Sequence, residues 1–237
     1  RAKAEKAVKA AEYKQRQALK QKVAEDTTAL FHKALVGKAK NVVLSNNKVA
    51  LTLSTKGATV VKAYLKNQKG SKQFVGHNMA DRSGKHDDEN GVTLFEGQRQ
   101  SLNYTLVAKE LNISTADLYF TPSAVTDSTV TLTADAGQGK TLVFNYRLGK
   151  NYMLHLDIKA TGMSGLFDPN ASRINVNWHE TVRQQERGFN FENRYARLDW
   201  KNTDGGTDYL SEASSKQETV DERAFMPAAW TSSSISW

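Results

Sequence analysis

The chain of 237 residues contains no cysteine and only 3 prolines. Without cysteine it can form no disulfide, no cysteine-ligated zinc site and no thiol nucleophile. Its 3 prolines and 15 glycines exclude collagen-like, proline-rich and low-complexity chains. Its apolar runs stay well short of the roughly 20 residues that a membrane-spanning helix needs, and no signal peptide is expected at its start. We therefore expect a soluble domain, or the soluble part of a larger protein.

The positive charge of the chain is confined to its N-terminal segment. Residues 1–40 carry 11 of the 33 Lys and Arg residues and 4 of the 25 Asp and Glu residues, a balance of +7. Residues 41–237 hold 22 basic and 21 acidic residues, so they are almost neutral. Binding to a phosphate backbone requires a clustered basic face, which this balance does not favour in the folded body. We expect no nucleic-acid partner.

The N-terminal segment is predicted to be helical. Its first 26 residues are rich in Ala, Lys, Gln and Glu, which are strong helix formers. Asp26 and Thr27 can cap a second short helix over residues 28–36, which Gly37 would end. The apolar face is thinner than a lipid-binding helix requires. We therefore expect residues 1–40 to form a basic helical tether or linker rather than a membrane-surface helix.

From residue 41 the pattern changes to alternating apolar and polar residues, which is typical of β-strands. The first such run turns at Asn46-Asn47 and predicts a hairpin in which Val49, Leu51 and Leu53 share one face. Further alternating runs follow at residues 91–97, 101–111, 127–136, 140–149, 151–162 and 172–182.

No pattern of helical length separates these runs, which argues against parallel βαβ units. The sequence therefore predicts a mainly-β fold, a large antiparallel β-sandwich over residues 41–237, preceded by the N-terminal helix. Residues 67–91 and 201–222 are polar and predict surface loops.

Three short motifs suggest sites but lack the required context. Residues 134–141 (ADAGQGKT) place an alanine where a phosphate-binding loop needs glycine, and a strand rather than a helix follows, so we predict a hairpin turn. The pair His179-Glu180 would need a second histidine at position 183, which is Arg183. His77 and His86 beside the acidic residues 87–89 match no metal-loop spacing. We expect no metal and no cofactor.

One strand carries a pair suited to acid–base chemistry. His155 and Asp157 would share one face of the strand, while Tyr152, Leu154, Leu156 and Ile158 would face the core. A histidine beside a carboxylate in a large sandwich suggests sugar chemistry. Because no third partner is visible, a solvated pair on the outer face is the preferred interpretation.

The least generic stretch is residues 181–200, which combine arginine, glutamate and aromatic side chains. Such a composition is favoured at protein interfaces, and it also suits an ion-pair clamp that holds a long connection to the sandwich. Both interpretations stay open. The candidate interaction or clamp residues are Arg183, Glu186, Arg187, Phe189, Phe191, Glu192, Arg194 and Tyr195.

A family resemblance rests on three stretches: STKGATVVKAYLKN (54–67), LYFTP (118–122) and RQQERGFNFENRYARL (183–198). Over roughly residues 41–223 the chain resembles the periplasmic domain of the bacterial membrane-protein insertase YidC, in its Bacteroidetes form. The resemblance implies a β-supersandwich related in shape to galactose mutarotase. It also implies a location on the periplasmic side of the inner membrane, within a multi-pass protein, and no catalytic residue in this domain.

The resemblance further implies the partners: accessory subunits of the Sec translocon, nascent membrane proteins and the rest of the parent chain. We therefore expect a non-enzymatic domain that supports insertion and folding of inner-membrane proteins by scaffolding and docking. The alternatives are a soluble periplasmic carbohydrate-binding or sugar-epimerising sandwich that uses His155 and Asp157, and a generic surface module. Residues 224–237 depart from the family pattern.

Overall fold

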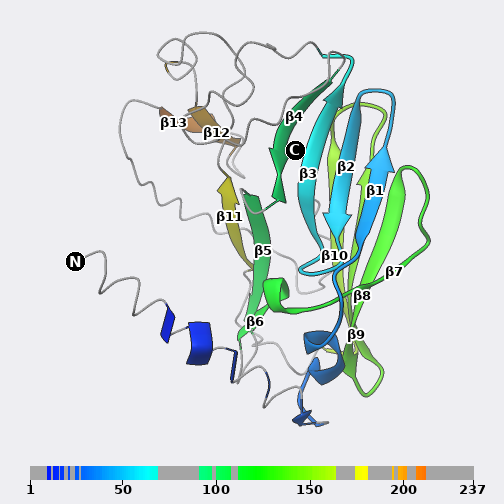
Figure 1. Ribbon diagram of the computed structural model, residues 1–237, viewed down its shortest axis with the longest axis vertical. Coiled ribbons are helices and arrows are strands. Elements are labelled where there is room, and N and C mark those ends of the chain that lie inside the picture. Colours follow the sequence, from blue (N-terminus) through cyan, green and yellow to red (C-terminus); the bar gives the residue numbers. More distant parts are fainter. Residues whose placement is uncertain are drawn as a thin grey trace.

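The structure, a computed structural model, describes residues 28–68, 91–97, 100–107, 112–163, 174–180, 197–201 and 207–211, with single positions between residues 10 and 26 and at Arg194. The described strands pair antiparallel throughout (Figure 1). Helical positions occur between residues 10 and 25. The predicted antiparallel β-sandwich after an N-terminal helix is confirmed. Within the described part, no helix combines the length and the apolar character needed to cross a membrane.

The first sheet is a four-stranded meander in the order β1-β2-β3-β4. The predicted hairpin at its start is confirmed, because β1 and β2 pair and Val49, Leu51 and Leu53 are buried. The side chain of Asn46 closes the turn: its Oδ1 accepts hydrogen bonds from the backbone N–H groups of Lys48 and Val49 at 2.7 and 2.8 Å. The strands are β1 (Asn41–Ser45), β2 (Val49–Ser54), β3 (Thr59–Lys66) and β4 (Gly91–Glu96).

The second sheet is also a four-stranded meander, in the order β10-β9-β8-β7. Its longest hairpin turns through residues 137–139, whose φ angles of 85°, 54° and 72° are all positive and favour glycine at the outer positions. The predicted hairpin turn at residues 134–141 is therefore confirmed. The strands are β7 (Thr121–Ser123), β8 (Thr129–Gly137), β9 (Lys140–Leu148) and β10 (Leu154–Thr161).

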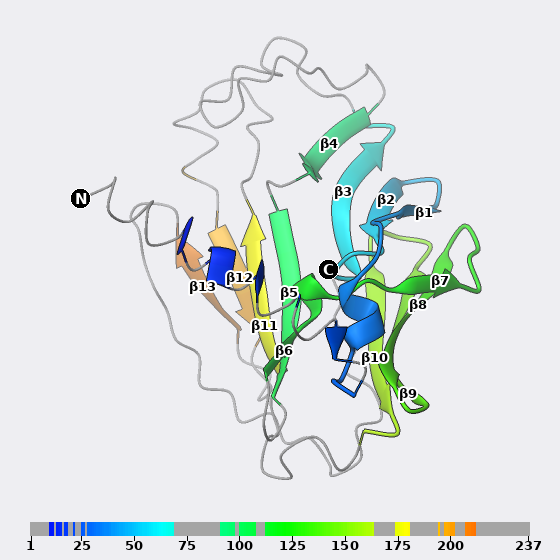
Figure 2. The ribbon, with the colours of Figure 1, turned by 60° about the horizontal axis from the view of Figure 1, so that its bottom comes forward.

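The main core lies between these two sheets, which Figures 1 and 2 show as stacked layers. Alternate residues of β8, β9 and β10 point into it, as strand geometry requires. Phe144 on β9 is fully buried, and its ring centroid lies 5.5 Å from that of Tyr104 and 5.2 Å from that of Phe120. The hydroxyl of Tyr146 donates a 2.6 Å hydrogen bond to the carbonyl oxygen of Ala58, which joins the second sheet to the first.

A third sheet extends the layer of the first. Its order is β11-β5-β6, and β5 contacts β3. Its strands are β5 (Gln100–Val107), β6 (Asn112–Ser114) and β11 (Ile174–Glu180), and a 3₁₀ helix, η3 (Thr115–Asp117), follows β6.

Two further strands, β12 (Arg197–Lys201) and β13 (Thr207–Ser211), pair with each other. In Figures 1 and 2, β5, β11, β12 and β13 lie successively farther from the first two sheets. The prediction of a loop over residues 201–222 is wrong at residues 207–211, where β13 forms. In that strand the apolar Tyr209 and Leu210 lie opposite β12 residues, and ladder pairing outweighs the polar composition of the stretch.

The N-terminal segment enters the sandwich at Phe31, which is buried in the core. Its φ of 62° interrupts the helix expected over residues 28–36, so only a 3₁₀ helix, η1 (His32–Leu35), forms. The backbone N–H of Phe31 donates to the carbonyl oxygen of Ala136 on β8 at 3.3 Å. A β-carbon on Gly37 would lie 2.8 Å from Cγ of Tyr119, so close packing also requires glycine there. The division of the chain at residue 40 stays a prediction.

Candidate functional site

An apolar cavity of about 330 Å³ lies where the three sheets meet. Volumes above roughly 300 Å³ are typical of ligand pockets. The first sheet supplies most of its wall, the edge strand β10 supplies Leu154, and β11 supplies Trp178. Its described lining residues are Val49, Leu51, Val60, Ala63, Leu65, Leu94, Phe95, Gln100, Tyr152, Leu154 and Trp178.

Gln100 is the polar exception in this wall. It begins β5, is only 6% exposed, and its Nε2 has no hydrogen-bond partner. A buried N–H group without a partner is costly, because it has lost its hydrogen bonds to water. The cavity therefore combines an apolar wall with one unsatisfied donor group, and no charged residue lies among its described lining residues.

Tyr152 lies at the rim of the cavity, where sequence reasoning expected a core residue. It precedes β10 in a bend and is 45% exposed, so the strand alternation that would turn it inward has not begun. The Nζ atom of Lys48 lies 5.3 Å from the centroid of the Tyr152 ring, a cation–π distance. The expectation that Tyr152 faces the core is therefore wrong, whereas Leu154, Leu156 and Ile158 are buried as expected.

The inner face of β11, formed by Ile174, Val176 and Trp178, continues the core-facing side of β5. Val176 pairs with Tyr104 and Trp178 pairs with Leu102, and cross-strand partners lie on the same face of a sheet. Yet Val176 is 51% exposed and Trp178 is 47% exposed, whereas Leu102 and Tyr104 are buried. This face therefore offers accessible apolar surface directly beside the cavity.

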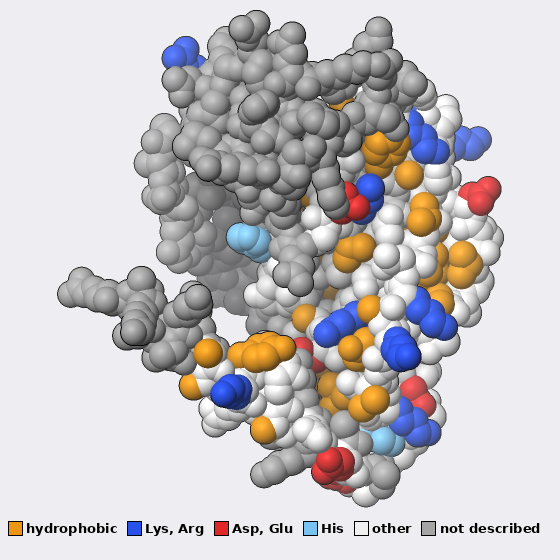
Figure 3. Space-filling view, in the orientation of Figure 1, with side chains coloured by type: hydrophobic (Ala, Val, Ile, Leu, Met, Phe, Trp, Pro, Cys, Tyr) orange, Lys and Arg blue, Asp and Glu red, His pale blue; other side chains and the backbone are white. Residues whose placement is uncertain are grey.

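The outer face of the first sheet differs in composition. Figure 3 shows positively charged side chains scattered over this face among hydrophobic and uncharged ones, and the four strands of the sheet contain lysine but no arginine. Lys62 on β3 forms a 3.2 Å ion pair with Glu96 on β4, across the strand pair. Such mixing is typical of an ordinary solvated surface.

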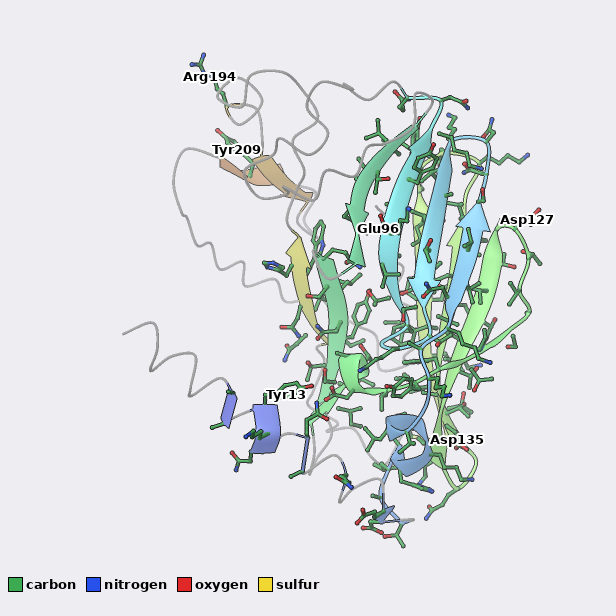
Figure 4. All side chains as sticks on the ribbon, in the orientation of Figure 1. Tyr13, Glu96, Asp127, Asp135, Arg194 and Tyr209 are labelled. Carbon is green, nitrogen blue, oxygen red and sulfur yellow. The ribbon has the colours of Figure 1, made fainter. Side chains whose placement is uncertain are left out.

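Most of the predicted interaction or clamp residues lie outside the described residues. These are Arg183, Glu186, Arg187, Phe189, Phe191, Glu192 and Tyr195. Arg194 is described and exposed, and Figure 4 shows its side chain pointing outward at the β12–β13 end of the molecule, where Tyr209 also lies. The choice between interface and clamp for this segment stays open.

The pair proposed for sugar chemistry lies on the outer face of β10. His155 and Asp157 alternate with the buried Leu154 and Leu156, so they point away from the core. Their register partners on β9 are Arg147 and Asn145. Neither side chain is among the described residues that line the cavity.

The described residues do not bring the weak metal motifs together into a site. His77, His86 and residues 87–89 lie outside the described residues. His179 is exposed on β11, and position 183 also lies outside the described part. Where the chain is described, no three His, Asp or Glu side chains are grouped to hold a metal ion.

Sequence reasoning missed the cavity and Gln100. The cavity depends on three sheets meeting, which the alternation within any one strand does not reveal. The only local signal was a glutamine directly before the alternating run of residues 101–111, and a polar residue there is ordinarily exposed.

Comparison with known proteins identifies relatives over most of the chain. The family model described as "YidC periplasmic domain" matches residues 41–224. The protein named "Membrane protein insertase YidC" from Phocaeicola vulgatus is 36% identical over 199 residues, which are 84% of this chain and 30% of that protein. Its namesake from Bacteroides fragilis is 34% identical over 86% of this chain and 31% of that protein. No solved structure matches the chain.

The chain thus spans about a third of the length of these relatives, all of which carry the same name. A further relative with that name, from Porphyromonas gingivalis, is 29% identical over 90% of this chain. The matched range begins at residue 41, where the first sheet begins, and it contains all thirteen described strands. The chain belongs to the YidC periplasmic domain family.

Proposed function

We propose that this chain is the non-enzymatic periplasmic domain of a membrane-protein insertase, and that it supports insertion and folding of inner-membrane proteins by scaffolding and docking. The family match over residues 41–224 carries this proposal. The relatives are named as insertases, and the chain spans 30% of the Phocaeicola vulgatus protein. The membrane-embedded part would therefore belong to the rest of the parent chain, and residues 1–40 would be the tether to it.

The inner face of β11 supports the docking role. Exposed apolar surface beside a packed core is a common mark of interaction sites. Val176 and Trp178 provide such surface on a regular strand, so a partner would meet a preformed face. The proposed partners are nascent membrane proteins and accessory subunits of the Sec translocon.

Site-specific photocrosslinking tests the docking role. We would replace Val176 by benzoylphenylalanine in the full-length parent protein, expressed in its own host, and identify crosslinked proteins by mass spectrometry. Lys159, which is exposed on the outer face of β10, is the matched control position. We expect crosslinks to membrane proteins or to translocon subunits from position 176 but not from position 159. Equal crosslinking from both positions, or none from either, would contradict docking at β11.

The arginine-rich segment has a separate test. We propose that Arg187 and Arg194 contribute either to partner capture or to a clamp on the sandwich. Replacing both by glutamate reverses their charge, and it should lower either the crosslinking yield or the thermal unfolding temperature. If both measurements matched the unsubstituted protein, neither role would hold for this segment.

A further inference from the structure

From the cavity between the three sheets we infer a binding site for a single acyl chain whose carbonyl group accepts a hydrogen bond from Gln100. The inference concerns the described cavity alone and does not depend on the insertase role. It rests on three observations: the size of the cavity, its wall and its one unsatisfied donor.

The size suits a short acyl chain. The cavity holds about 330 Å³. A methylene group is close in size to a water molecule, whose share of liquid volume is about 30 Å³, so the cavity accommodates about ten chain carbons. The aromatic side chains of Tyr152 and Trp178 line the cavity and are partly exposed to solvent. A chain can therefore enter the cavity beside them.

The wall selects a ligand whose buried part is uncharged. Valine, leucine, alanine and phenylalanine side chains form most of the lining, and no described lining residue can neutralise a charge. A buried unpaired charge would lose its hydration without compensation, whereas hydrocarbon gains by leaving water. The ligand is therefore apolar over the part that the cavity encloses.

Gln100 distinguishes an acyl chain from an apolar peptide. Its buried Nε2 lacks a partner, and the last torsion of a glutamine side chain is soft, so its N–H groups can turn toward a bound acceptor. An acyl ester has a carbonyl acceptor and no N–H donor in its buried part. A peptide brings an N–H and a C=O group with every residue, and one glutamine cannot satisfy them. The donor count therefore favours the acyl chain.

Isothermal titration of the 237-residue chain with 1-decanoylglycerol, kept below its critical micelle concentration, tests the site. We expect saturable binding of one molecule, with a negative heat-capacity change that reports apolar burial. The matched ligand is 1-O-decylglycerol, an ether that lacks the carbonyl group. The ester should bind about 3- to 10-fold more tightly than the ether, as one hydrogen bond to a neutral donor contributes.

Two pairs of variants test whether the ligands bind in this cavity and whether Gln100 contacts the carbonyl group. Gln100→Leu should bind the ester and the ether equally, while Asn175→Leu, an exposed amide on the opposite face of β11, should keep the preference for the ester. Ala63→Phe fills the cavity and should weaken both ligands at least tenfold. Ala50→Phe, on the neighbouring strand but on its other face, should leave both affinities unchanged. Circular dichroism confirms folding, and the Gln100 pair decides the matter if Ala63→Phe does not fold.

Co-sedimentation with lipid vesicles distinguishes two sources of the acyl chain, a bilayer lipid and a free monoacyl molecule. Co-sedimentation with dioleoylphosphatidylcholine vesicles that Ala63→Phe abolishes would identify a bilayer lipid as the source. Decanoylglycerol binding without co-sedimentation would identify a free monoacyl molecule. Either result supports the site. Four results would overturn it: no saturable binding of the ester, a folded Gln100→Leu variant that still prefers the ester to the ether, equal binding by a folded Ala63→Phe variant, or binding of a leucine-rich hexapeptide in place of the ester.

Discussion

The second and third sheets share one alternating sequence pattern, but they differ in how far their inward-facing side chains are covered by another layer. On β8, β9 and β10 the inward residues are almost completely buried, because the first sheet and β5 lie across them. On β11 the corresponding residues, Val176 and Trp178, keep about half of their surface exposed, although their partners on β5 are buried. Alternation thus decides which way a side chain points, and the opposing layer decides whether it is buried.

This difference in burial decides whether an apolar side chain stabilises the fold or is available to bind a ligand or partner. A side chain that is covered on folding contributes its apolar area to stability, at about 25 cal/mol for each Å². A side chain that stays half exposed retains part of that area for a ligand or partner. The second sheet is therefore expected to determine the stability of the domain, and the β11 face is expected to be tolerant of substitution.

The largest expected effect comes from truncating the centre of the covered core. Phe144→Ala removes a ring that packs against Tyr104, Phe120 and Tyr146, and it should lower the free energy of unfolding by about 3–5 kcal/mol. Val176→Ala on the exposed face should change it by less than about 0.5 kcal/mol. Urea unfolding followed by circular dichroism measures both.

The control for this comparison is Val130→Ala, which makes the same chemical change as Val176→Ala at a buried position of β8. It should cost about 2 kcal/mol, from the lost transfer energy and the cavity that remains. Equal losses at positions 130 and 176 would show that β11 is covered in solution, and the contrast between the sheets would then fail.

A smaller effect on the free energy of unfolding is expected when the two buried tyrosines are replaced by phenylalanine. The effect should differ in sign between the two positions. Tyr146→Phe on β9 removes the 2.6 Å hydrogen bond to the carbonyl of Ala58 and should cost about 1–2 kcal/mol. Tyr104 on β5 has a buried hydroxyl with no hydrogen-bond partner. Tyr104→Phe removes that unsatisfied group and should leave stability unchanged or raise it by up to about 1 kcal/mol.

Chemical unfolding of the two single variants and of the double variant tests this pair. Losses of similar size from both tyrosines would mean that the hydroxyl of Tyr104 has a partner in solution. The double variant should show nearly the sum of the single effects if the two hydroxyls act independently.

The smallest effect is expected from alkaline pH. Burial raises the pKa of Tyr104 and of Tyr146 above the ordinary tyrosine value of 10.0. Since the unfolded chain ionises near pH 10 and the folded chain does not, the stability from each tyrosine is fully present below pH 10. It falls as the pH rises toward the folded pKa. Each tyrosine should account for a loss on the order of 1 kcal/mol or less between pH 9 and pH 10.5.

Urea unfolding at these two pH values measures the loss. Each Tyr→Phe variant should remove about half of the tyrosine contribution, because phenylalanine does not ionise. If the variants showed the same alkaline loss as the unsubstituted chain, lysine residues rather than the tyrosines would be responsible.

Much of the fold could be predicted from the sequence, because strand formation and facing follow from local patterns. The alternating runs correctly placed β1 to β5, β8, β9, β10 and β11, and the turns at Asn46 and at residues 137–139 had local signals. The prediction failed where tertiary contacts overrode local preference. Phe31 adopts a left-handed backbone conformation to enter the core, and β13 pairs with β12 in spite of its polar surroundings.

The candidate site was less predictable than the fold. The cavity exists because Ala63, Leu154 and Trp178 come together from three sheets, and no sequence spacing encodes that meeting. Gln100 becomes informative only once its burial and its unpartnered Nε2 are known. By contrast, the outward direction of His155 and Asp157 followed directly from strand periodicity.

The insertion of Phe31 into the core has a mechanical consequence. The chain enters the sandwich through a buried ring, a backbone hydrogen bond to Ala136 and a 2.6 Å hydrogen bond from the N–H of Tyr119 to the carbonyl of Ala34. Tension applied along the N-terminal segment would therefore reach the packed interior at β8 before it reached the edge of β1. In a domain tethered through that segment, such an anchor would direct the load away from the strand that is easiest to peel.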